Sequence, residues 1–249
     1  IISFFGLALH LIKPFFFPYN TYEMPDILRK ITFENICAVS ALIYPFVLIF
    51  KNKTLLDYIA TIGMIGGIAA FFYPTEVILG MFDSMTVVYE HKLFAFDTIR
   101  FFAVHYIIFI VPMLLLYYQI HTFELKRIIY FPITIMSVLT LIFLNELILE
   151  KLGWLNEVHN FYDRNIFYDH NIRNSSFVFG ITDSLRSISG WLLILVPQKW
   201  QEPIFRPVYW ILFPIIIYGP ILYYLFYFVT NKINKRKLNL ISSVKVASQ

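Results

Sequence analysis

The chain has 249 residues, of which 59% are hydrophobic and only 14% are charged. Soluble domains carry about 45–50% apolar and about 25% charged residues, so this composition, with a mean hydropathy of +0.68, excludes an independent soluble catalytic domain. The net charge of +4 would suit nucleic acid, but the basic residues stand at the ends of apolar blocks and in the tail, where they orient a membrane protein. The single cysteine, Cys37, excludes an internal disulfide and a cysteine-rich metal site.

Six apolar segments follow in chain order, most of them near the roughly 20 residues that a helix needs to cross a bilayer. They are residues 1–17, 33–50, 55–73, 98–120, 128–149 and 208–230. The first is interrupted by Pro14 and Pro18, and we interpret it as the end of a first transmembrane helix. We therefore predict an all-α fold, in which residues 1–249 form a single polytopic transmembrane bundle of about six spanning helices.

Two connections between these segments are long. Residues 74–97 are rich in acidic side chains, and we expect them at the membrane interface. Residues 150–206 form a longer outer loop that contains an apolar run, 188–196, which is too short to span and is expected to be interfacial or re-entrant. Within the third segment, Gly63 and Gly67 have the small-xxx-small spacing that lets two helix backbones approach closely.

Basic residues gather on one predicted side of the bundle. They are Lys51 and Lys53, Lys126 and Arg127, and the tail residues Lys232, Lys235, Arg236 and Lys237. By the positive-inside rule, this side faces the cytoplasm. We predict a multi-pass protein of the cell membrane with a cytoplasmic tail at 231–249 and an extracellular loop at 150–206, although Arg29 and Lys30 run against the rule.

Polar residues inside membrane helices are costly and suggest function. Under this topology they concentrate in the outer half of the bundle, and they are Glu34, Asn35, Cys37, Arg100, His105, Asn145 and Glu146. A cysteine, a histidine and carboxylates at one depth are the parts of a thiol nucleophile site. Each also has a structural explanation: a thiol can fill space, a histidine or amide can link helices, and Arg100 can pair with Asp97.

Three stretches, residues 33–45, 51–57 and 101–105, together resemble the bacterial YwaF-type integral membrane proteins. That family looks related to a eukaryotic transmembrane lipid acyltransferase. The resemblance covers residues 33–149, and a weaker similarity is present at residues 174–179. It departs from the family pattern at Asn35, where a histidine is expected.

The resemblance implies an acyl-transfer site in the outer leaflet, in which His105 deprotonates Cys37 and the thiolate attacks a lipid ester. Asn35 or Asn145 would stabilise the oxyanion, and Glu34 or Glu146 would fix the histidine tautomer. Glu34 is also expected to share a helical face with Cys37. We expect membrane lipids as partners, with no nucleic acid, metal or cofactor.

Two other functions stay open at this point. The chain could be a non-enzymatic transmembrane subunit of a larger membrane assembly, in which case the polar residues would only fix helix contacts. It could also be a small transporter or lipid-binding protein. That function needs a polar path through the inner half, where the segments offer little beyond Asp57.

Overall fold

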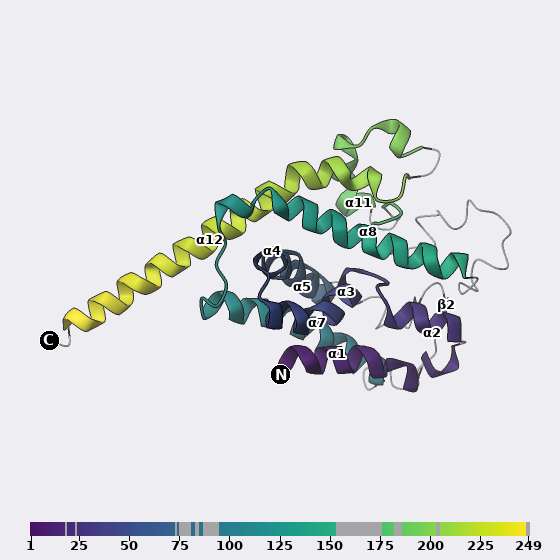
Figure 1. The fold of residues 1–249 in the computed structure, drawn as a ribbon, viewed down its shortest axis with the longest axis horizontal. Coiled ribbons are helices and arrows are strands. Elements are labelled where there is room, and N and C mark those ends of the chain that lie inside the picture. The colour runs from purple at the N-terminus through teal and green to yellow at the C-terminus, as the bar shows by residue number, and fades with distance from the viewer. Residues whose placement is uncertain are drawn as a thin grey trace.

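A computed structural model describes residues 1–17, 19–22, 24–72, 74, 81–82, 85–86, 95–152, 176–181, 186–202 and 205–247. The chain is a helical membrane bundle (Figure 1). Its α-helices are α1 Ile2–Ile12, α2 Met24–Ile31, α3 Ile36–Phe50, α4 Lys53–Tyr58, α5 Met64–Phe72, α7 Phe96–Tyr117, α8 Tyr130–Lys151, α11 Arg186–Ser189 and α12 Leu212–Ala247. The strands among the described residues are two short ones, β1 Met81–Phe82 and β2 Met85–Thr86, which pair antiparallel.

Four helical stretches are long and apolar enough to cross a membrane. They are Lys53–Phe72, Phe96–Tyr117, Tyr130–Lys151 and Tyr209–Arg236. Two predicted spans are shorter, Ile2–Phe15 and Ile36–Phe50. The second measures about 22 Å at 1.5 Å per residue, less than a hydrocarbon core of about 30 Å. The multi-pass helical prediction is thus confirmed, whereas the count of six spans is not.

The two short helices end early for local reasons. Asn35 caps α3, because its side chain accepts a hydrogen bond from the Ala38 amide. The same helix ends at Lys51, whose backbone is left-handed with φ 52°. In the first segment, the α-helix ends at Ile12, and a 3-10 turn carrying Pro14 follows. The third segment is one continuous span in which a π-helical stretch, Ile59–Gly63, joins α4 to α5.

Close packing of α5 against α7 confirms the prediction made from the paired glycines. A Cβ atom built on Gly67 would lie 2.9 Å from the His105 carbonyl oxygen and 2.9 Å from the Phe109 amide nitrogen. On Gly63 it would collide with the Tyr44 hydroxyl, which donates to the Ile108 carbonyl at 3.1 Å. The missing side chains therefore let α3, α5 and α7 approach closely.

The remaining elements pack around this centre. Helix α1 lies against α3 and α7, and α12 runs alongside α8 (Figure 1). Helix α12 continues to Ala247, so the tail predicted to begin at Asn231 is helical at its start rather than a separate segment. No proline or glycine follows Pro220 in this helix, and the polar residues beyond Thr230 are compatible with a helix that leaves the bilayer.

The long connection at 150–206 is described in part. Its apolar run, 188–196, forms α11 and a 3-10 stretch, Gly190–Leu195, and neither is long enough to span. Trp191 contacts Tyr218 edge-on, and Trp200, in the turn after the run, stacks on Phe213, so the run and this turn together cover the beginning of α12. Most of the connection at 74–97 lies outside the described residues, and its expected interfacial position stays a prediction.

Candidate functional site

Cys37 is the second residue of α3 and is partly buried. The predicted segment at 33–50 begins its helix only at Ile36, because Asn35 is the cap. Glu34 therefore lies before the helix, and the expectation that it shares a helical face with Cys37 was wrong. Its carboxylate instead accepts a hydrogen bond from Lys30 at 2.8 Å. The thiol thus stands in the first turn, where the helix dipole favours negative charge.

His105 is buried on α7, and its ring lies 4.2 Å, centroid to centroid, from that of Phe101. Its Nδ1 lies 2.8 Å from the Phe101 carbonyl oxygen. A carbonyl only accepts, so Nδ1 carries the proton and Nε2 keeps the lone pair that a base needs. Glu34 and Glu146 were expected to fix this tautomer, and that expectation was wrong. The backbone does so, because both carboxylates are bound to other side chains.

Helices α3 and α7 begin at the same end of the bundle and run side by side. Tyr44, seven residues after Cys37, donates to Ile108, seven residues after Phe101. Cys37 and Phe101 therefore lie at about the same height, as does the His105 ring bound to Phe101. A direct interaction between Cys37 and His105 stays a prediction.

Seven charged side chains gather at this end, and we call them the Arg100 cluster: Lys13, Arg29, Lys30, Glu34, Asp97, Arg100 and Glu146. Three ion pairs organise them. Arg29 binds Glu146 through its Nε at 3.1 and 3.2 Å, Lys30 binds Glu34, and Arg100 binds Asp97 at 2.8 Å. The predicted pairing of Arg100 with Asp97 is confirmed. Asn145 donates to Thr32 at 3.2 Å, which links α8 to the end of α2.

The segment 176–181 reaches the start of α3 from far along the chain. Ser176 Oγ accepts a hydrogen bond from the Ile36 amide at 2.8 Å, next to Cys37. Ser176 and Phe177 both have positive φ, 53° and 65°, which is uncommon outside glycine. Val178 and Phe179 are fully buried. The weaker resemblance at 174–179 therefore includes Ser176, whose hydroxyl binds the residue before Cys37. The sequence analysis assigned no role to Ser176.

A second buried group, the Asp57 cluster, occupies the opposite end of the bundle: Asp57, His121, Arg127 and Tyr223. The Asp57 carboxylate lies 2.8 Å from His121 Nε2 and 3.3 Å from the Tyr223 hydroxyl. Arg127 Nε donates to it at 2.6 Å. Burial opposes the charge of Arg127, but the hydrogen bond and charge of Asp57 raise its pKa above the ordinary value.

Sequence analysis found only Asp57 in this half. His121 and Arg127 lie in the connection between α7 and α8, outside the predicted spans, and hydropathy does not single them out. Glu124 lies beside Arg127 on the same connection. Hydrogen bonds from Lys126 and Arg127 lower the pKa of Glu124 to about 2.

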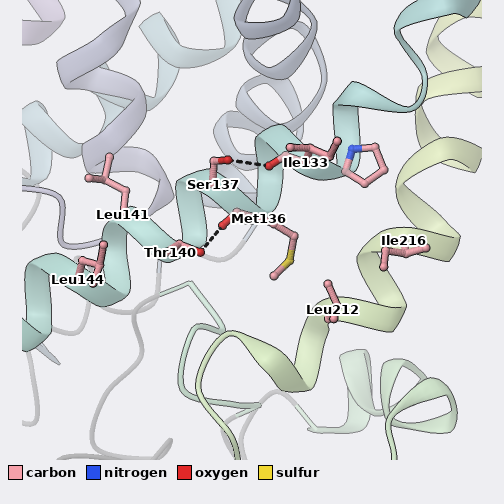
Figure 2. A pocket seen from close by; sticks show the side chains of 9 residues that line it. Ile133, Met136, Ser137, Thr140, Leu141, Leu144, Leu212 and Ile216 are labelled. Carbon is pink, nitrogen blue, oxygen red and sulfur yellow. Dashed lines mark hydrogen bonds between the residues drawn. The ribbon is translucent and has the colours of Figure 1, made fainter.

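Two apolar grooves border α8. One, of about 570 Å³, lies between α8 and α12 (Figure 2). Its hydroxyls belong to Ser137 and Thr140, and each donates to the carbonyl four residues earlier, at 2.9 and 2.8 Å. The other groove, of about 350 Å³, separates α3 from α8. Neither groove is lined by Cys37 or His105, so we assign neither to the candidate site.

In the described part of the chain, no three His, Cys, Asp or Glu side chains are grouped to hold a metal ion. The sequence model of the TMEM164 family, a family of transmembrane proteins, matches residues 3–168. No curated protein and no solved structure matches the chain.

Proposed function

The chain belongs to the TMEM164 family, and on that premise we propose that this multi-pass membrane protein transfers acyl groups between lipids through a thioester on Cys37. The residues that resemble the YwaF-type proteins, and through them a lipid acyltransferase, lie within the matched part of the chain. The expected substrates are membrane phospholipids and lysophospholipids.

The position of Cys37 in the first turn of α3 carries this proposal. Burial among apolar groups makes a thiol inert, whereas a helix N-terminus stabilises the thiolate. Cys37 is only partly buried and is the second helical residue, so the helix dipole favours its thiolate form. His105, with Nε2 as the acceptor nitrogen, would supply the base at the same height.

In the first half-reaction, the Cys37 proton moves to Nε2 of His105 and the sulfur bonds to the carbonyl carbon of a lipid ester. The tetrahedral intermediate then breaks its carbon–oxygen bond. The imidazolium returns the proton to the departing alkoxide, which leaves as a lysolipid. In the second half-reaction, an acceptor hydroxyl gives its proton to Nε2 while its oxygen attacks the thioester. The carbon–sulfur bond breaks, and the proton returns to Cys37.

Ser176 is our candidate for the group that stabilises the oxyanion, in place of Asn35 and Asn145. Its oxygen accepts a hydrogen bond from the Ile36 amide, so the hydroxyl proton is still able to donate a hydrogen bond to the oxyanion. Asn35 already uses its side-chain oxygen as a helix cap, and the Asn145 amide donates to Thr32. The left-handed backbone of Ser176 and Phe177 fits this role, because strain of this kind clusters at functional sites.

The test uses purified protein incubated with phospholipid that carries a labelled acyl chain. We expect a hydroxylamine-sensitive label on the wild type and none on Cys37→Ala. His105→Ala should slow transfer by about 10²–10⁴-fold, the usual scale of a lost general base. Ser40→Ala, one turn further along α3, is the matched control and should transfer normally. If the wild type transfers no acyl group, or if Cys37→Ala matches it, the acyltransferase proposal fails and a non-enzymatic subunit is favoured.

We also assign the Arg100 cluster to the outer leaflet, because exposed lysines such as Lys53 and Lys126 gather at the opposite end. In a Cys37→Ala background, Asn20→Cys in intact cells should react with a membrane-impermeant thiol reagent. Lys126→Cys should react only after the cells are opened. The reverse pattern would move the candidate site to the cytoplasmic leaflet.

A further inference from the structure

Lys13 is a buried lysine without a carboxylate partner among the residues that the structure describes. Only 4% of its surface is exposed, and its Nζ lies 5.4 Å from the centre of the Tyr19 ring. Each carboxylate of the Arg100 cluster is bound to another cation, to Arg29, Lys30 or Arg100. Among the residues that the structure describes, the cluster therefore has four basic side chains and three carboxylates.

The surroundings of Lys13 add to this positive excess. The Arg100 guanidinium lies 5.5 Å from the same Tyr19 ring, and its Nη2 donates to the Tyr19 hydroxyl at 3.2 Å. Burial raises the pKa of Tyr19 well above its ordinary value, so the phenol stays neutral. Helix α7 begins beside these residues with Asp97 in its first turn, and its cap, Ala95, makes no side-chain hydrogen bond to the first amides. The N-terminus of such a helix attracts anions.

We propose that Lys13 binds an anionic group, the phosphate of a membrane lipid headgroup, between the end of α1 and the first turn of α7. A buried charge is costly unless it is paired, and a phosphate would supply the missing negative charge. The inference rests on the proposed function, because it names the part of the lipid that holds the substrate beside Cys37 and His105. Arg100 lies five residues before His105 on α7.

Two observations favour a lipid over free phosphate. Phe15, Phe16 and Phe17 follow Lys13 directly and are 78%, 39% and 43% exposed, which suits a site that opens into the bilayer. Asp97 Oδ2 is buried without a hydrogen-bond partner among the described residues. A headgroup with a donor beyond its phosphate would satisfy it.

The experiment measures binding, not transfer, on full-length Cys37→Ala protein in detergent. The probes are dioctanoylphosphatidylglycerol, dioctanoylglycerol with the same chains and no phosphate, and inorganic phosphate. We expect the phospholipid to raise the unfolding temperature and to stay bound in native mass spectrometry, and dioctanoylglycerol to do neither. Lys13→Met should weaken phospholipid binding about tenfold or more. Lys126→Met, which removes an exposed lysine at the other end, should leave binding unchanged.

The unliganded proteins give a second, independent readout. Removing an unpaired buried charge should leave Lys13→Met at least as stable as the Cys37→Ala parent. Destabilisation would reveal an acidic partner for Lys13 within the protein and overturn the proposal. Phospholipid binding that is equally tight in Lys13→Met would also overturn it. Lys13-dependent binding of inorganic phosphate as tight as that of the lipid would support the anion site and identify the soluble ion as its ligand. If binding succeeds while wild-type protein transfers no acyl group, only the proposed function fails.

Discussion

At the Asp57 cluster, one carboxylate is surrounded by His121, Arg127 and Tyr223, whereas the Arg100 cluster has four basic side chains and three carboxylates. Both groups are buried, and both join helices that are far apart in sequence. In the first, the Asp57 carboxylate has three side-chain partners, of which Arg127 alone would balance its charge. In the second, Lys13 has no carboxylate partner in the described part of the chain, and its Nζ lies over the Tyr19 ring.

This difference separates a structural role from a binding role. The Asp57 cluster ties the connection between α7 and α8 to α4 and α12, and each charge is already compensated. At the Arg100 cluster, the excess charge lies at the same end as Cys37 and the left-handed segment at Ser176. Proteins break the ordinary rules of packing and charge pairing mainly at functional sites, and an excess of buried basic side chains is such a departure.

Replacing Asp57 should produce the largest loss of stability. Asp57→Asn removes the buried carboxylate that binds Arg127 and leaves that cation with only the more exposed Glu124, and breaking a buried pair costs about 3–5 kcal/mol. The measurement is thermal or denaturant unfolding in detergent, compared with Lys13→Met at the other end, where no loss is expected. Equal losses from both variants would mean that the two clusters do the same structural work.

A smaller effect is expected at the contact between α5 and α7. A side chain on Gly67 must push against the α7 backbone at 2.9 Å, and such overpacking costs about 1–3 kcal/mol. Gly67→Ala should therefore lower the unfolding temperature, and Gly67→Leu should lower it further. Gly66→Ala is the matched control on the same helix, because a Cβ there meets nothing within 4 Å. Equal stability of Gly67→Ala and Gly66→Ala would contradict the close contact.

The smallest effect belongs to Glu124, at the exposed edge of the Asp57 cluster. Its folded pKa, about 2, lies below its ordinary value of 4.5. The stabilisation is therefore complete above pH 4.5 and disappears as the pH falls toward 2. Glu124→Gln should unfold at a slightly lower temperature than wild type at pH 7, and this difference should shrink below pH 4.5. If the difference in unfolding temperature did not depend on pH, the charge of Glu124 could not be its cause.

Hydropathy was sufficient to predict a multi-pass helical protein, because the cost of exposing backbone groups to lipid acts on each segment separately. The glycine spacing predicted the close contact of α5 with α7 for a similar reason, since it depends on residues within one helix. The number of spans was harder to predict. The cap at Asn35 shortens α3 by a local hydrogen bond that hydropathy does not register.

The sequence predicted that Cys37, Arg100, His105 and Glu146 lie in one half of the bundle, because depth follows from position along each helix. It could not determine their partners. Arg29 meets Glu146 across 117 residues, and Ser176 meets Ile36 across 140. His105 binds the carbonyl of its own helix, and Glu34 and Glu146 bind Lys30 and Arg29. Which helix faces lie together is a property of packing, so the three-dimensional arrangement was needed to find that Lys13 has no carboxylate partner among the described residues.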